Sequence, residues 1–136
     1  MPRRTNRSHR VEEGSSTVEL AVLAPLALVL LLGVLQAGLW LHTRSLCTHA
    51  AQHGASAAAT VTGSNAAGEQ AAAAFLARSP SAATHPEISV HAGAADVSVR
   101  VSATTPLVLP LPGLQIPVEG LSQAGKERFT TPGTTP

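Results

Sequence analysis

The apolar and polar positions divide the chain into one long apolar run and a more polar remainder. The run covers Leu20–Leu41, which is 22 residues without a charge, and Gln36 is its only strongly polar side chain. As a helix that rises about 1.5 Å per residue, it would span about 33 Å, close to the hydrocarbon thickness of a bilayer. It exceeds the roughly 7–15-residue apolar region of a cleaved secretory signal. The pattern therefore predicts one membrane-spanning helix.

The remainder predicts further helix and then strands. Good helix formers continue the first helix to about Ala59, and Asn65 can cap a second helix over 66–78. Alternation of valine with polar residues predicts a β-hairpin over 88–104. Residues 106–117 contain too many prolines for a central strand, so they predict an edge strand or an extended arm. Residues 118–129 predict a last short strand.

These elements predict an α+β fold in four parts. They are a basic cytoplasmic leader (1–14), the transmembrane helix with its extracytoplasmic continuation (15–60), a small α+β extracytoplasmic part (61–129) and a disordered tail (130–136). The short antiparallel sheet has exposed edges and too little surface to be stable alone, which favours a protein completed by partners.

The charges indicate how the predicted helix is oriented. Four arginines precede the apolar run, whereas Arg44 alone follows it closely. The excess of positive charge on cytoplasmic flanks places the N-terminus in the cytoplasm and residues 42–136 outside. The preceding arginines are Arg3, Arg4, Arg7 and Arg10.

Composition excludes several functions. The net charge is only +1, so nothing indicates nucleic-acid binding, and aromatic residues make up 2% of the chain, too few for a large enzyme-like core. Cys47 is the single cysteine and Asp96 the single aspartate, and no phosphate-binding loop, HExxH or Gly-x-Ser-x-Gly motif occurs. We therefore predict no catalytic residues, cofactor or small-molecule substrate.

Three histidines are the one candidate for a metal site. On a helix, His42, His49 and His53 fall on one face, and His49 and His53 have a spacing that can hold a metal. No nearby carboxylate completes a ligand set, so a solvated or partner-facing polar stripe is favoured and no metal site is predicted. Whether the stripe has a role stays open.

The junction between the leader and the apolar run carries the most specific motif. Glu19 lies at the edge of the run, where a carboxylate alone would be interpreted as reaching back to the headgroups. The basic leader, Gly14, four residues, Glu19 and a long apolar helix resemble a type IV prepilin signal. That resemblance implies cleavage by a prepilin peptidase between Gly14 and Ser15. The new α-amino group could then be neutralised by Glu19 of a neighbouring subunit.

The resemblance extends into the helix. Val18–Ala21, Pro25, the leucine block Leu26–Leu32 and Gly33 are similar to the TadE-like family, pseudopilin-like proteins of tight-adherence (Flp) pilus systems. Pro25 removes a backbone hydrogen bond and predicts a kink, which is either a flexible turn that helps the subunit leave the bilayer or a passive feature.

The function that the resemblance implies is that of a minor pilin or pseudopilin in assembly of a tight-adherence pilus or related secretion machine. Its partners would be the lipid bilayer, a prepilin peptidase, other pilin subunits and pilus-assembly membrane proteins. It would lie in the cytoplasmic membrane, or in or at the base of a pilus. The alternatives are an uncleaved single-pass scaffold of the cell envelope, and a secreted enzyme freed from the apolar run by signal peptidase.

Overall fold

A computed structural model describes residues 10–108 and 114–126, with side chains from residue 18 onward. The leader before Arg10, part of the proline-rich segment, the predicted strand end at 127–129 and the predicted tail 130–136 lie outside the described residues. The chain divides into two units between Leu35 and Gln36.

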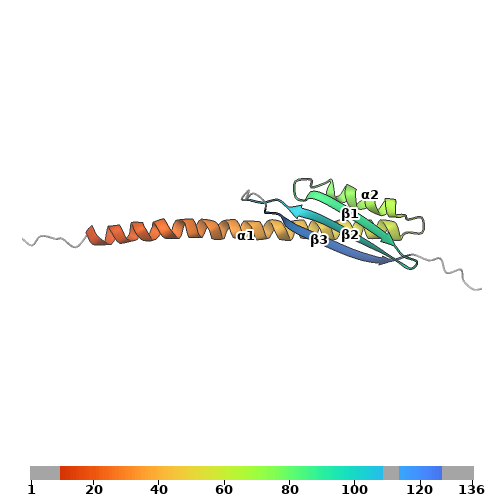
Figure 1. The fold of residues 1–136 in the computed structure, drawn as a ribbon, viewed down its shortest axis with the longest axis horizontal. Coiled ribbons are helices and arrows are strands. Elements are labelled where there is room, and N and C mark those ends of the chain that lie inside the picture. Colours follow the sequence, from red (N-terminus) through yellow and green to blue (C-terminus); the bar gives the residue numbers. More distant parts are fainter. Residues whose placement is uncertain (1–9, 109–113, 127–136) are drawn as a thin grey trace, which may run out of the picture. The chain divides into compact units, whose positions relative to one another are not determined.

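The fold consists of two helices followed by three strands (Figure 1). The elements are α1 (Arg10–Ala59), α2 (Asn65–Leu76), β1 (Thr84–Ala92), β2 (Asp96–Thr105) and β3 (Ile116–Gly125). The strands form one antiparallel sheet with β2 in the centre. This arrangement confirms the predicted α+β class, with a long apolar helix, a second helix and a short antiparallel sheet.

The first unit contributes the N-terminal part of α1, with Pro25 inside the helix. Its large apolar side chains are exposed all around the helix, as in Leu20 at 69%, Leu30 at 63% and Val34 at 70%. A helix of a soluble protein would bury one apolar face.

The second unit has its core between one face of the sheet and the helices. Val97, Val99 and Val101 of β2 are fully buried, whereas Ser98 and Arg100 between them point to the other face. This alternation is the period of two that the sequence displays. Figure 1 shows the sheet along the C-terminal part of α1, with α2 beside β1.

Small residues let the elements of this core approach closely. The face of α1 toward the sheet consists of alanines and Cys47, and the fully or almost fully buried residues are Cys47, Ala50, Ala51, Ala55 and Ala58. A Cβ on Gly54 would lie 2.9 Å from the carbonyl oxygen of Gly68, so α1 and α2 touch backbone to backbone. A Cβ on Gly120 would overlap the backbone of Cys47 and Thr48, which places β3 directly on α1.

The boundaries of α2 differ from the prediction. Ser64, not Asn65, is the N-cap, and its side-chain oxygen accepts a hydrogen bond from the Ala67 amide at 3.2 Å. Serine and asparagine are equally good caps, so the sequence did not distinguish two adjacent candidates. The helix ends at Leu76 and turns follow through Ala82, so it is shorter than 66–78.

The strands differ from the prediction as well. β1 begins at Thr84 instead of Ile88, and β3 begins at Ile116, within the segment predicted as an edge strand or extended arm. The early part of β1 was missed because it contains Pro86 and a shift in register between Thr84 and Glu87. His85 adopts φ 50°, a left-handed conformation that is uncommon outside glycine and fits this irregularity.

Candidate functional site

The predicted processing junction lies in the first turns of α1. Gly14 and Ser15 have helical backbone, because α1 begins at Arg10 and continues through them without a break. A peptidase cleft binds extended backbone, which glycine adopts readily. The described structure instead has a helix there, so a peptidase would first have to unwind this turn.

Glu19 lies one turn further along the same helix and is exposed. Within residues 10–108 and 114–126, no ion pair is found for its carboxylate. It is therefore available to a cation from outside the described chain.

The apolar part of α1 meets the length and composition of a membrane span. The candidate segment is Val18–Ala59, and none of its most apolar 18-residue window is buried. That exposure argues against the core helix of a soluble protein, which is mostly buried, and leaves a membrane helix or a signal sequence. The helix suggests a single-pass membrane protein.

Gln36 has a role that sequence analysis did not find. Its amide Nε2 donates to the carbonyl oxygen of Pro106 at 3.3 Å, and its Oε1 accepts from the Val108 amide at 2.9 Å. One side chain therefore holds the chain just after β2 against the start of the second unit. The only signal in the sequence is that a polar side chain in an apolar helix requires partners.

Two further contacts secure the same part of α1. The guanidinium of Arg44 lies 5.5 Å from the centre of the Trp40 ring, and Trp40 packs against the core. The hydroxyl of Thr43, which is buried, donates to the carbonyl oxygen of Ala82 at 2.7 Å, before β1. Residues 36–44 are thus part of the folded second unit.

All three histidines of the predicted stripe are exposed, and two of them contact Phe75 of α2. The ring of His53 stacks on Phe75 of α2 with centroids 4.8 Å apart, and His49 lies 6.4 Å from the same ring. His49 also faces the side-chain oxygen of Gln52 at 3.2 Å. His42 is exposed and makes none of these contacts. Two of the three histidines therefore help to hold α2, and among the described residues no group of three metal-ligating side chains is found.

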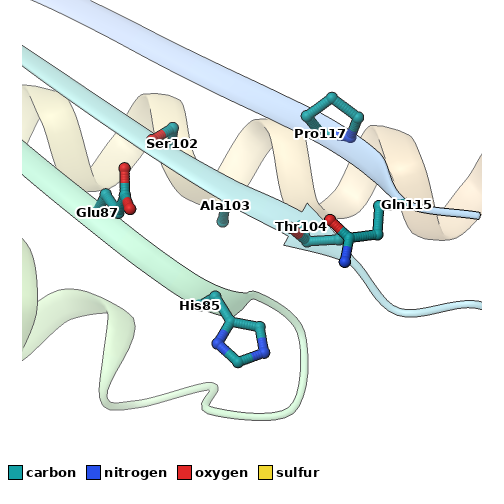
Figure 2. Close-up of a pocket in the computed structure, with 7 residues that line it drawn as sticks. All are labelled: His85, Glu87, Ser102, Ala103, Thr104, Gln115 and Pro117. Carbon is teal, nitrogen blue, oxygen red and sulfur yellow. The ribbon is translucent and has the colours of Figure 1, made fainter. Parts of the chain in front are cut away.

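A shallow hollow of about 450 Å³ lies on the sheet near the end of β2 (Figure 2). Side chains from three strands surround it, with His85 and Glu87 from β1 and Pro117 from β3. No hydrogen bond connects His85, Glu87 and Ser102 within the described part of the chain, so no proton relay is formed there. The other lining residues are Ala103, Thr104 and Gln115.

The remaining electrostatic features lie outside the hollow. Arg100 and Glu119 form an ion pair at 3.1 Å on the solvent-facing side of the sheet, where both side chains are about half exposed. Such a pair contributes little to stability because water screens it. Burial raises the pKa of the Cys47 thiol, so this cysteine is held protonated in the core.

Comparison with known proteins assigns one segment of the chain. Residues 14–56 match the family model described as TadE-like protein. This segment is TadE-like. No curated protein and no solved structure matches the chain.

The TadE-like segment contains both the predicted processing junction and much of the second unit's core. It begins at Gly14, includes Glu19, Pro25 and Gln36, and ends at Ser56, three residues before the end of α1. The resemblance noted in the sequence is therefore confirmed for these residues. The match does not extend to α2 or the strands.

The TadE-like family is associated with the assembly of tight-adherence pili and is a structural family. This association connects the single apolar helix with membrane and pilus-subunit partners. It gives no specific role to Gly14, Ser15, Glu19 or Pro25, which stay predictions.

Proposed function

We propose that this chain is a minor pilin or pseudopilin that takes part in assembly of a tight-adherence pilus or a related secretion machine. It is a single-pass protein of the cytoplasmic membrane with its N-terminus inside. A prepilin peptidase cleaves it between Gly14 and Ser15. The cleaved subunit then packs through its apolar helix with other pilin subunits.

The observation that carries this proposal is the TadE-like match beginning at Gly14. The matched segment includes the part of α1 in the first unit, where the large apolar side chains are exposed. A protein stored in a bilayer and then packed in a filament needs such a surface, because lipid and neighbouring helices cover it in turn. The four leader arginines support the inside location of the N-terminus.

Cleavage within a helix requires a weak turn. Glycine costs about 1 kcal/mol relative to alanine in a helix interior, so the turn at Gly14 opens at lower cost than its neighbours. The absence of a side chain also lets a peptidase approach the backbone. These properties reconcile the helical Gly14 with its proposed role as the residue before the cut.

Glu19 supplies the charge for assembly. Cleavage would create an α-amino group on Ser15, and a carboxylate from a neighbouring helix would neutralise it. The exposed Glu19, whose carboxylate has no ion pair among the described residues, fits this role.

The outer part of the chain supplies lateral contacts or ends growth of the filament. β1 and β3 each have one edge that is not paired within the three-stranded sheet. Such edges can accept a strand from another subunit.

The decisive experiment is the intact mass and N-terminal sequence of the protein purified from native membranes. We expect a chain that begins at Ser15. A Gly14→Leu variant should keep its leader, whereas the neighbouring Ser16→Ala variant should be processed normally. A wild-type chain that keeps residues 1–14 would refute the processing step.

Assembly can be tested separately from processing. Glu19→Gln should be cleaved normally but fail to enter pili, measured as the amount of this subunit in sheared filaments. Glu69→Gln, an exposed glutamate on α2, is the matched control and should assemble as the wild type does. Equal assembly of both variants would refute the role of Glu19.

One observation favours a second candidate, an uncleaved membrane-anchored scaffold of the cell envelope. The helix runs unbroken through Gly14 and Ser15, whereas protease clefts bind extended backbone. In that case the leader would be retained and Glu19 would be an ordinary carboxylate at the membrane edge. The same mass measurement distinguishes the two functions.

A further inference from the structure

We propose that one end of the second unit is seated in the outer interface of the membrane through Leu107, Val108 and Leu114. The partner is the lipid itself, at the boundary between headgroups and acyl chains. The inference rests on the proposed single-pass anchorage and assigns a second membrane contact beyond the helix.

The length of the free apolar helix supports this placement. Between the charged Glu19 and the start of the second unit at Gln36, Leu20–Leu35 offer 16 uncharged residues. At about 1.5 Å per residue they span about 24 Å, whereas the hydrocarbon core is about 30 Å thick and needs about 20 residues. The missing length corresponds to the next four residues. Gln36 to Leu39 therefore lie within the outer edge of the hydrocarbon.

Gln36 holds the chain after β2 at this depth. Its amide accepts from Val108 and donates to Pro106, at 2.9 and 3.3 Å. In the bilayer each backbone polar group needs a partner. These two bonds satisfy a carbonyl and an amide that lie beyond the paired part of β2, and Pro106 has no amide hydrogen to satisfy. By satisfying these backbone groups, Gln36 allows the segment after β2 to enter the edge of the bilayer.

The chemistry of this end suits lipid. The sequence carries no charged residue between Arg100 and Glu119, and Leu114 is 47% exposed, just before the Ile116–Thr105 pair that closes this end of the sheet. Glu87 of β1 lies three positions from the Thr84–Thr104 pair at this end, whereas Asp96 and Lys126 lie at the opposite end itself, beside the turn between β1 and β2. The end with Leu114 is also the one that Gln36 of the apolar helix contacts, through Pro106 and Val108.

Trp40 and its position next to Arg44 agree with this arrangement. Trp40 lies four residues beyond Gln36, so it is about 6 Å further out, in the zone where tryptophan is enriched. It is the only tryptophan in the chain, which makes the depth of this region measurable.

The experiment uses the full chain in phospholipid vesicles, with and without lipids brominated near the headgroup end of the acyl chain. In a Trp40→Phe background, tryptophan is introduced as Leu114→Trp or, as control, Leu121→Trp. Leu121 is a leucine of β3 with a similar exposure of 52%. We expect brominated lipid to remove more than half of the Leu114→Trp emission and to leave the Leu121→Trp emission unchanged.

Several outcomes would overturn the inference. Quenching of the native Trp40 without quenching of Leu114→Trp would refute the lipid contact while the membrane anchorage stands. Equal quenching of both introduced tryptophans would mean that the whole sheet lies on the bilayer, and would refute the insertion of one end alone. Absence of quenching at the native Trp40 would refute the anchorage itself, and with it the inference.

A further variant tests the positioning role of Gln36. Adding Gln36→Leu to Leu114→Trp keeps the helix apolar but removes both hydrogen bonds to the segment after β2. We expect the quenching at Leu114→Trp to fall, while the circular dichroism of the vesicle-bound protein keeps its helix and strand content. Unchanged quenching would refute the role of Gln36.

Discussion

Gly120 is the residue on which the contact between β3 and α1 depends most directly. Its missing side chain lets the strand lie on the helix backbone at Cys47 and Thr48. Backbone atoms cannot rotate aside as the end of a long side chain can, so this contact leaves no room for a methyl group. The contact explains why a glycine occurs in the middle of a strand, where it is otherwise unfavourable.

We predict that Gly120→Ala destabilises the second unit by about 1–3 kcal/mol, because the added methyl group forces α1 and β3 apart. Gly125→Ala is the control, since a Cβ there has no atom within 4 Å. The free energy of unfolding in detergent micelles, measured by denaturant and followed by Trp40 fluorescence, checks this. Equal stability of the two variants would contradict the packing described here.

We predict that the Cys47 thiol reacts at least about tenfold more slowly with iodoacetamide in the folded protein than in denaturant, which corresponds to about 1.4 kcal/mol of local opening. Its side chain is fully buried, and burial raises its pKa, so little thiolate is present. Rapid alkylation of the folded protein would contradict the buried position.

The same raised pKa predicts a loss of stability in alkali. The folded state retains the proton more strongly than the unfolded state, so stability is unaffected below the ordinary thiol pKa of 9.0 and falls as the pH rises above it. Denaturation at pH 8 and pH 10 should show a larger loss for the wild type than for Cys47→Ala. An equal loss would mean that other groups cause it.

At the scale of elements, the sequence predicted those that follow a strong period. The alternation along β2 identified its buried valines, and the long apolar run identified α1. The start of β1 could not be predicted, because Pro86 and the left-handed His85 interrupt the pattern before the strand becomes regular.

The candidate site was predictable to a different extent. The junction at Gly14 and Glu19 is a local motif, so the sequence alone displays it. The Gln36 contact joins residues about seventy positions apart, and the stacking of His53 on Phe75 depends on how α2 folds back. Such pairs arise from tertiary packing, which no short pattern contains.

We predict that Ser64→Ala destabilises the second unit by about 1 kcal/mol, because it removes the hydrogen bond that caps α2. Ser81→Ala, an exposed serine in the turn after α2, should change the stability little. The midpoint of denaturant unfolding in micelles measures both. A smaller effect at Ser64 than at Ser81 would contradict its role as the cap.

At the scale of the whole molecule, the division after Leu35 predicts two independent responses to denaturant. In nanodiscs, the amides of β2 and of α1 beyond Trp40 should exchange with deuterium together as the second unit opens. The amides of Leu20–Leu35 should stay protected at the same denaturant concentration, because lipid offers no competing hydrogen bonds. Simultaneous loss of protection in both segments would contradict the division.

The alanine-rich core has a consequence for how this chain tolerates mutation. In most proteins the harmful core substitutions remove atoms, because they leave cavities. Here many buried positions, including Ala50, Ala51 and Ala72, are already close to the smallest side chain, so nearly every substitution adds atoms. In saturation mutagenesis of the second unit, substitutions by larger side chains should therefore be the ones that most often destabilise the core. Substitutions by smaller side chains should be harmful mainly at the valines of β2.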